Sequence, residues 1–133
     1  MFYIGHFTAD EHTAEPSPRH GYFTALTVAV DAQQAAYKFK TLIARLVNEH
    51  DAFRPLAAVY LEDIIESDQL PDEALITRYQ SSQGEFPKSV SHTLPGYRGS
   101  QARAYGHAPD VPPPDPKGQG EALYPESTPF IEF

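Results

Sequence analysis

Carboxylates are the densest reactive side chains in this chain. Between residues 62 and 73 the acidic residues are Glu62, Asp63, Glu66, Asp68, Asp72 and Glu73, with no lysine or arginine among them. Oxygen ligands of this kind hold Mg²⁺ or Ca²⁺ in proteins. The spacing does not match a calcium-binding loop, and in a strand Glu62 and Glu66 share one face while Asp63 points to the other. A solvated acidic rim is the favoured interpretation, and a carboxylate metal site in residues 62–73 is the alternative.

A second candidate for chemistry is the stretch from Phe86 to Arg98, which mixes hydroxyl side chains with His92 and is followed by Arg103. Cationic and hydroxyl groups together can hold an anionic ligand around His92, Arg98 and Arg103. Hydroxyl side chains at turns also bond their own backbone, so a structured loop without a ligand is the other interpretation.

Several catalytic and cofactor signatures are missing from the sequence. The six histidines match no metal-ligand spacing, no Gly-x-Ser-x-Gly nucleophile motif is present, and no glycine-rich loop precedes the predicted helix. We therefore expect no cofactor, no bound metal and no catalytic residue, and a binding protein rather than an enzyme.

Charge and composition exclude further classes. The 133 residues include 18 acidic and 10 basic side chains, a formal net charge of −8. Binding to phosphates requires clustered lysine and arginine, so we expect neither a nucleic acid nor a membrane as partner. The absence of cysteine excludes disulfides and thiolate zinc sites. The first residues lack a basic start, and no apolar run has the length of a signal core or a bilayer span, so we expect a cytoplasmic location.

The clearest elements begin in the first third of the chain. Residues 22–30 alternate larger groups at even positions with mostly small ones at odd positions, which predicts a strand. Asp31-x-x-Gln34 matches a capping box, in which Asp31 accepts from an early helical N–H and Gln34 reaches back to the Asp31 amide. Residues 32–48 then place their apolar side chains on one arc of a helix. This pattern predicts a strand followed directly by an amphipathic helix.

A second strand follows the helix. Apolar side chains at odd positions predict a strand over residues 57–66, interrupted only by Asp63, which lies either at a bulge or in a pair. A strand, a helix and a strand predict a parallel pair with a right-handed crossover. Further strands are predicted at residues 2–8, at 75–81 beside the strand 57–66, and at 90–94. The predicted fold is α+β, a two-layer sandwich with one main helix on a mixed four- or five-stranded sheet.

The composition changes at Pro95. Eight of the 13 prolines fall in the last 39 residues, and no regular element fits this stretch. We expect two parts: a core of residues 1–94, and an irregular proline- and glycine-rich segment of residues 95–133. Its end carries three large apolar side chains, Phe130, Ile131 and Phe133, which we expect to dock on the core.

One helix covers only one face of the predicted sheet. The other face is expected to show Phe23, Tyr60 and Ile64 beside polar side chains. Such a face either meets water, as antiparallel and mixed sheets allow, or is covered by the tail, by a second copy of the chain or by a partner. The leading hypothesis is a small cytoplasmic protein-binding or regulatory module that acts through protein–protein contacts or self-association. The alternative is a small enzyme or ligand-binding protein that uses the anionic-ligand residues or the acidic run.

Overall fold

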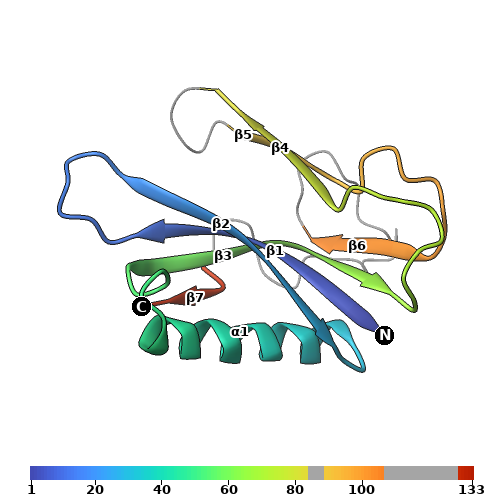
Figure 1. The fold of residues 1–133 in the computed structure, drawn as a ribbon, viewed down its shortest axis with the longest axis horizontal. Coiled ribbons are helices and arrows are strands. Elements are labelled where there is room, and N and C mark those ends of the chain that lie inside the picture. Colours follow the sequence, from blue (N-terminus) through green and yellow to red (C-terminus); the bar gives the residue numbers. More distant parts are fainter. Residues whose placement is uncertain (84–88, 107–128) are drawn as a thin grey trace.

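Figure 1 shows the computed structural model of the chain, in which a helix lies on one side of a five-stranded sheet and a two-stranded hairpin lies on the other. The structure describes residues 1–83, 89–106 and 129–133. In chain order the elements are β1 (Phe2–Glu11), β2 (Arg19–Val28), α1 (Ala32–Glu49), β3 (Leu56–Ser67), β4 (Arg78–Ser82), β5 (Ser89–Thr93), β6 (Ala102–Gly106) and β7 (Ile131–Glu132).

The main sheet has the order β2-β1-β3-β6, and β7 joins it by pairing with β3. All of its described pairings are antiparallel. Because β2 and β3 both run antiparallel to β1, they are parallel to each other, and α1 connects them across one intervening strand. The predicted strand–helix–strand unit and two-layer α+β fold are confirmed. The two parallel strands are not neighbours, since β1 lies between them.

The helix begins where the sequence predicts. Asp31 has extended backbone, and its side chain accepts a hydrogen bond from the Gln34 N–H at 2.8 Å. This bond satisfies one of the free N–H groups at the start of the helix. The Gln34 side chain accepts from the Val30 N–H at 2.9 Å, so the reciprocal bond forms one residue earlier than predicted. Within the described residues, no helix has the length and the apolar character that a membrane span requires.

The core lies between α1 and the sheet. The Phe7 ring on β1 stacks on Phe23 of β2, with centroids 5.0 Å apart, and meets Phe39 of α1 edge-on at 5.6 Å. A Cβ atom at Gly5 would lie 2.7 Å from Phe7 Cε2 and 2.9 Å from Phe39 Cε2. Both distances are far below van der Waals contact. Only glycine therefore allows these two rings to pack at this point of β1.

The side-chain alternation of β3 reverses in the middle of the strand. Asp63 lies opposite His6, and Leu61 lies opposite the next residue of β1. Glu62 is therefore an extra residue on β3, which defines a β-bulge. Directly before the bulge Val59 and Leu61 face α1, and after it the even-numbered residues, including Ile64, do so. Asp63 is paired and lies next to the bulge, so both predicted explanations of the interruption hold.

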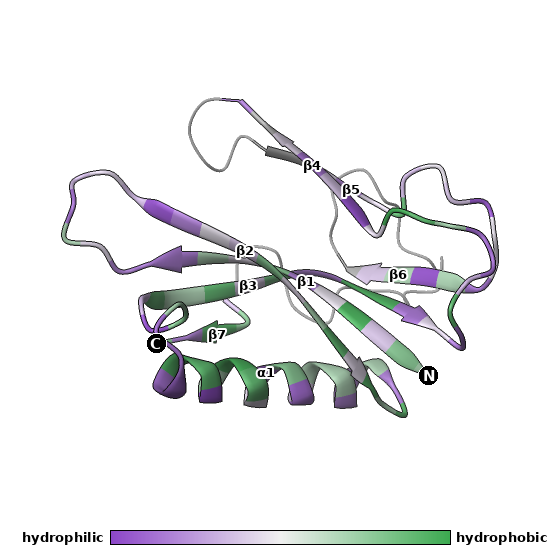
Figure 2. Ribbon diagram, in the orientation of Figure 1, coloured by the Kyte–Doolittle hydropathy of each residue, from purple (hydrophilic) through white to green (hydrophobic). Residues whose placement is uncertain are grey.

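The strands β4 and β5 form a separate antiparallel hairpin over the face of the sheet opposite α1 (Figure 1). Strands are found near the predicted residues 75–81 and 90–94, but β4 pairs with β5 rather than with β3. Figure 2 shows hydrophilic residues along the hairpin, in contrast to the hydrophobic side of α1 that faces the sheet. Polar strands of this kind have no apolar row that identifies a partner strand in the sequence.

Two short strands lie after residue 94, where the sequence patterns predict no regular element. β6 pairs with the second half of β3 and β7 with its first half. Phe130, just before β7, is buried in the core, and Ile131 packs against the core. Short strands with little alternation are specified mainly by the neighbours they pack against. Much of the predicted irregular segment, residues 107–128, lies outside the described residues.

Candidate functional site

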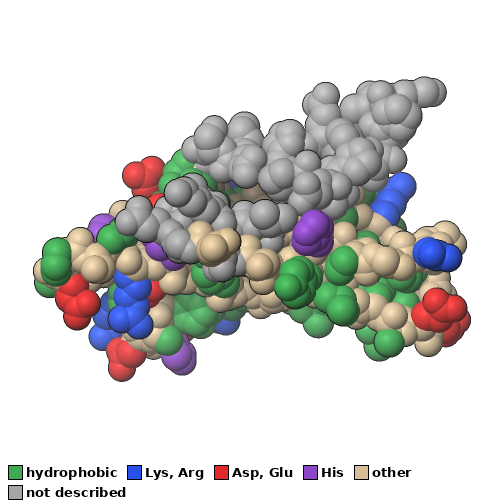
Figure 3. All heavy atoms as spheres, turned by 90° about the horizontal axis from the view of Figure 1, so that it is seen from above, with side chains coloured by type: hydrophobic (Ala, Val, Ile, Leu, Met, Phe, Trp, Pro, Cys, Tyr) green, Lys and Arg blue, Asp and Glu red, His purple; other side chains and the backbone are tan. Residues whose placement is uncertain are grey.

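The face of the sheet opposite α1, which we call the open face, carries exposed apolar side chains along β2. Side chains alternate along a strand, and Phe23 and Ala25 of β2 belong to the core on the α1 side. Tyr22, Leu26 and Val28 therefore lie on the open face, where 49%, 66% and 67% of their surfaces are exposed. We call these three residues the β2 apolar row. Figure 3 views the molecule from the side opposite α1 and shows hydrophobic side chains gathered toward the lower right.

β2 is also an edge strand, since β1 is its only partner among the described strands. The Ala29 N–H donates to the Met1 C=O at 3.1 Å, just beyond the end of the paired strands. Opposed residues in an antiparallel ladder alternate between pairs that exchange backbone hydrogen bonds and pairs that do not. Since Ala29 bonds to Met1, the neighbouring pair of Phe2 and Val28 exchanges none. Because the pattern alternates, the backbone groups of every second residue of β2, counted from Val28, point away from β1.

These outward backbone groups have little protection. The Val28 C=O accepts a hydrogen bond from Lys38 Nζ at 2.7 Å. In the described part of the chain, the outward N–H and C=O groups of Thr24 and Leu26 bond to no other residue. Natural edge strands are usually protected by charged side chains or proline. Residues 21–30 contain neither. As far as the described residues go, the edge of β2 can therefore accept another strand.

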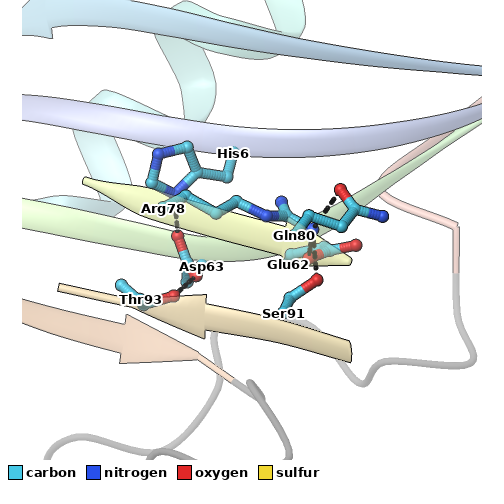
Figure 4. Close-up of polar contacts among 7 residues, drawn as sticks. All are labelled: His6, Glu62, Asp63, Arg78, Gln80, Ser91 and Thr93. Carbon is cyan, nitrogen blue, oxygen red and sulfur yellow. Dashed lines mark hydrogen bonds and ion pairs between the residues drawn. The ribbon is translucent and has the colours of Figure 1, made fainter. Parts of the chain in front are cut away.

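A buried polar cluster lies between the open face and the hairpin (Figure 4). His6 and Asp63, opposed on β1 and β3, are 1% and 2% exposed. His6 Nδ1 contacts one carboxylate oxygen of Asp63, and the other oxygen accepts from the Thr93 hydroxyl on β5. Burying a carboxylate is costly unless its oxygens are hydrogen-bonded. Asp63 therefore fastens the hairpin to the sheet.

Arg78 of β4 provides a second connection between the hairpin and the sheet. Its guanidinium forms an ion pair with Glu62 and donates to Ser91 Oγ at 2.8 Å and to Gln80 Oε1 at 3.3 Å. The β-bulge makes this possible, because it lets the consecutive residues Glu62 and Asp63 both reach the hairpin.

Two buried nitrogen atoms of the cluster, His6 Nε2 and Arg78 Nε, have no hydrogen-bond partner among the described residues. In the neutral imidazole, a His6 Nδ1–H that donates to Asp63 leaves Nε2 with the lone pair. A carboxylate that orients an imidazole in this way is found in general-base pairs and beside metal-bound histidines. In chemical terms, the cluster can accept a hydrogen bond from a small ligand at His6 Nε2.

A different carboxylate, Glu66, lies on the α1 side of the sheet. It accepts hydrogen bonds from the Tyr3 hydroxyl at 2.9 Å, Arg103 Nε at 3.2 Å and the Tyr105 hydroxyl at 3.4 Å. Burial, together with the Glu66 charge, raises the pKa of the Tyr3 hydroxyl well above its ordinary value and also raises the pKa of Tyr105. Glu66 is surrounded by donors of the chain itself, which is typical of a structural carboxylate.

One of the three apolar residues predicted on the open face lies there. Tyr60 donates to Asp10 Oδ2 at 3.4 Å, and burial together with the Asp10 charge raises its pKa. The prediction is wrong for Phe23 and Ile64, which both face α1. α1 packs on the odd-numbered row of β2, where most side chains are small and Phe23 is the one large apolar residue. α1 itself presents the buried alanines Ala35 and Ala36 to the sheet. Ile64 belongs to the core on the α1 side because the bulge reverses the alternation.

The structure does not bring together the three residues predicted around an anionic ligand. The neighbours of His92 on β5 face the sheet, so His92 itself points away from it. Its ring centroid lies 6.3 Å from that of Tyr79 on the hairpin. Arg98 lines a cavity of about 340 Å³ between two loops. Arg103 is paired with Glu66 on the α1 side of β6.

The acidic run of residues 62–73 is also divided. The carboxylates of Glu62, Asp63 and Glu66 contact different partners on β4, β1 and β6, among others. The remaining acidic residues of the run are exposed in the turn after β3. The described residues contain no group of three or more potential ligands that could hold a metal ion. The favoured interpretation of the run as a solvated rim therefore applies to its second half.

Sequence reasoning missed the β2 apolar row and the His6–Asp63 pair. The alternation in β2 is visible in the sequence, but it does not tell which row the helix will cover. His6 and Asp63 are 57 positions apart. The available signal was that each is a polar residue within an apolar strand pattern, and a buried carboxylate requires a partner.

No family model, no curated protein and no solved structure matches the chain.

Proposed function

We propose that the protein is a protein-binding module, and that its docking surface is the edge of β2 with the β2 apolar row. One observation carries this proposal: a ten-residue edge strand exposes aliphatic side chains on one face and has no charge or proline from residue 21 onward. Such edges are templates for an added strand. We further propose that the module acts in the cytoplasm, which fractionation of host cells tests.

Binding would use two kinds of contact. Backbone groups of Thr24 and Leu26 supply hydrogen bonds to an added strand, independent of its sequence. The β2 apolar row selects partners with apolar side chains at alternate positions. Leu26 and Val28 are about two-thirds exposed, so burying each contributes about 1–2 kcal/mol. A net charge of −8 favours a protein partner over a nucleic acid or an anionic membrane.

The test is capture of bound proteins from host lysate with the tagged wild-type chain and with the double variant Leu26→Lys, Val28→Lys. Tyr37→Lys is the matched control, since Tyr37 is an exposed apolar residue on α1. We expect wild type and Tyr37→Lys to recover the same bound proteins, among which a second copy of the chain counts as a partner, and the double variant to lose them. Equal recovery by all three chains would refute the docking surface.

A second candidate function is the binding of a small ligand beneath the hairpin, and the two buried nitrogen atoms without described partners favour it. A ligand at a hundred times its dissociation constant stabilises a protein by about 2.7 kcal/mol. A thermal-shift panel of anions and metabolites is therefore sensitive enough to detect one. A shift that disappears in His6→Phe supports the buried cluster, whereas a shift that disappears only in Arg98→Ala places the ligand in the loop cavity.

A further inference from the structure

We infer that the occupant of the β2 edge is a second copy of this chain, paired antiparallel about a twofold axis at Thr24. This inference rests on the proposed function and specifies its partner. It follows from which backbone groups of β2 point outward, from the side chains that this pairing brings together, and from the charges at its two ends.

Backbone direction limits the possible registers. The groups of Tyr22, Thr24, Leu26 and Val28 point toward the edge, as the bond from Ala29 to Met1 shows. Two copies can exchange hydrogen bonds only where outward residues oppose outward residues, so even-numbered positions must pair with even-numbered positions. An axis that passes between two consecutive residues violates this condition, because it sets even-numbered against odd-numbered positions. An axis at Thr24 satisfies the condition, and it uses the strand from His20 to Val28 without overhang.

The same register is favourable for the side chains on the open face. Each Leu26 lies opposite Tyr22 of the second copy, so two exposed apolar side chains are buried against each other. Thr24 lies opposite Thr24 of the second copy.

The two neighbouring allowed registers are less favourable. An axis at Phe23 sets Leu26 opposite His20, which breaks up the apolar pairs. An axis at Ala25 pairs Val28 with Tyr22, but it sets Leu26 opposite Thr24 and shortens the paired stretch of each strand to residues 22–28. The axis at Thr24 therefore combines the longer pairing with the Leu26–Tyr22 contact, which it forms twice.

Charges at the ends of the paired strands are complementary. In this register Arg19 lies opposite Ala29 of the second copy, and Asp31 of the second copy is two positions further along. Asp31 follows the end of β2 in the bend that leads into α1, and a residue two positions beyond the opposed one is within reach of a long side chain. Arg19 lies 3.5 Å from Glu11 of its own chain, yet its side chain remains 74% exposed and can approach a second carboxylate. The twofold axis forms this contact twice, so opposite charges meet at both ends although each chain carries a net charge of −8.

The outward direction of the Thr24 N–H allows a selective test. Thr24→Pro removes a donor that the described part of the single chain does not use, and proline is tolerated in an edge strand when its nitrogen faces solvent. In the dimer the same change removes one hydrogen bond in each direction across the axis. We expect the dissociation constant to rise roughly 30-fold. Thr24→Ala keeps the N–H and serves as the matched control.

Sedimentation equilibrium over a range of concentrations measures the effect. We expect wild type and Thr24→Ala to approach twice the 14.8 kDa mass of one chain as the concentration rises, Thr24→Pro to do so only at roughly 30-fold higher concentration, and Leu26→Lys to stay closer to 14.8 kDa than wild type at every concentration. Should Thr24→Pro fail to fold, Leu26→Lys and hydrogen exchange of wild type decide the question. The amides of Thr24 and Leu26 should then become protected as the protein concentration rises.

A wild-type chain that stays monomeric, or a dimer unaffected by both variants, overturns the inference. The proposed function fails separately. If the wild-type chain is monomeric but still captures other proteins through Leu26 and Val28, the docking surface stands and only its occupant is wrong. If it is a dimer that depends on Leu26 and captures nothing else, the second copy is the partner.

Discussion

Phe130 offers the sharpest test of how the last described residues stabilise the sheet. Its side chain is 3% exposed, and its ring centroid lies 5.4 Å from that of Phe7. Lys40 Nζ lies 4.9 Å from the centre of the same ring, and the Phe130 N–H donates to the Val59 C=O at 2.6 Å. β7 itself contains only two residues. Phe130 is therefore the main anchor of this segment.

Replacing Phe130 by alanine removes a buried aromatic ring and leaves a cavity against Phe7. Changes of this kind cost about 3–5 kcal/mol. The total stability of a domain is about 5–15 kcal/mol, so we expect Phe130→Ala to remove a large fraction of it. The backbone bonds of β7 are too few to hold the segment without the ring, so its amides should also lose protection against hydrogen exchange.

Urea unfolding followed by far-UV circular dichroism measures this loss, since the chain has no tryptophan for fluorescence. Phe133→Ala is the matched control, because Phe133 is 41% exposed and its removal should cost only about 1–2 kcal/mol. If the two variants lost equal stability, or if Phe130→Ala lost none, the ring would not be an anchor and the reasoning from burial would be refuted.

Three further changes test other contacts. Thr93→Val leaves one oxygen of the buried Asp63 carboxylate without its donor, so we expect a loss of about 1–3 kcal/mol in urea unfolding and faster exchange of the β4 and β5 amides, whereas Thr93→Ser should preserve both. Gly5→Ala forces a Cβ against two rings and should cost about 1–3 kcal/mol, while Gly21→Ala, whose Cβ would lie 3.8 Å from its nearest neighbour, Glu11 Oε2, should be close to neutral; equal melting temperatures for the two variants would contradict this packing. The raised pKa of Tyr3 means that the folded chain keeps this proton after the unfolded chain has lost it, so stability should fall as the pH rises above the ordinary tyrosine value of 10.0, and urea unfolding should show a smaller fall in Tyr3→Phe.

The elements that follow from local rules could be predicted from the sequence. Asp31 and Gln34 mark the start of the helix, and the apolar arc of residues 32–48 identifies its buried side. The strands on either side of the helix follow from their alternation. These features depend on neighbours within a few positions, which the sequence displays directly.

The candidate site could not be predicted in the same way, because it depends on which surfaces meet. The bulge at Glu62 reverses the alternation of β3, and this moves Ile64 from the predicted open face into the core. Because the row of β2 that contains Phe23 faces α1, Phe23 packs against the core and Leu26, on the other row, is exposed. The pairing of His6 with Asp63 requires β1 and β3 to be neighbours, and neither strand carries a local signal of that.

The position of β1 inside the sheet has a kinetic consequence. β1 and β2 are close in sequence and can pair early. The other edge of β1 stays unpaired until β3, which begins at Leu56, pairs with it. Contacts between distant segments form slowly, because the loop between them must first close. During that delay both edges of the β1–β2 hairpin are unpaired and can pair with strands of other chains, which favours intermolecular misassembly. Refolding yield should therefore decline as the protein concentration rises. It should also depend on the rate at which α1 packs on the hairpin and β3 pairs with β1.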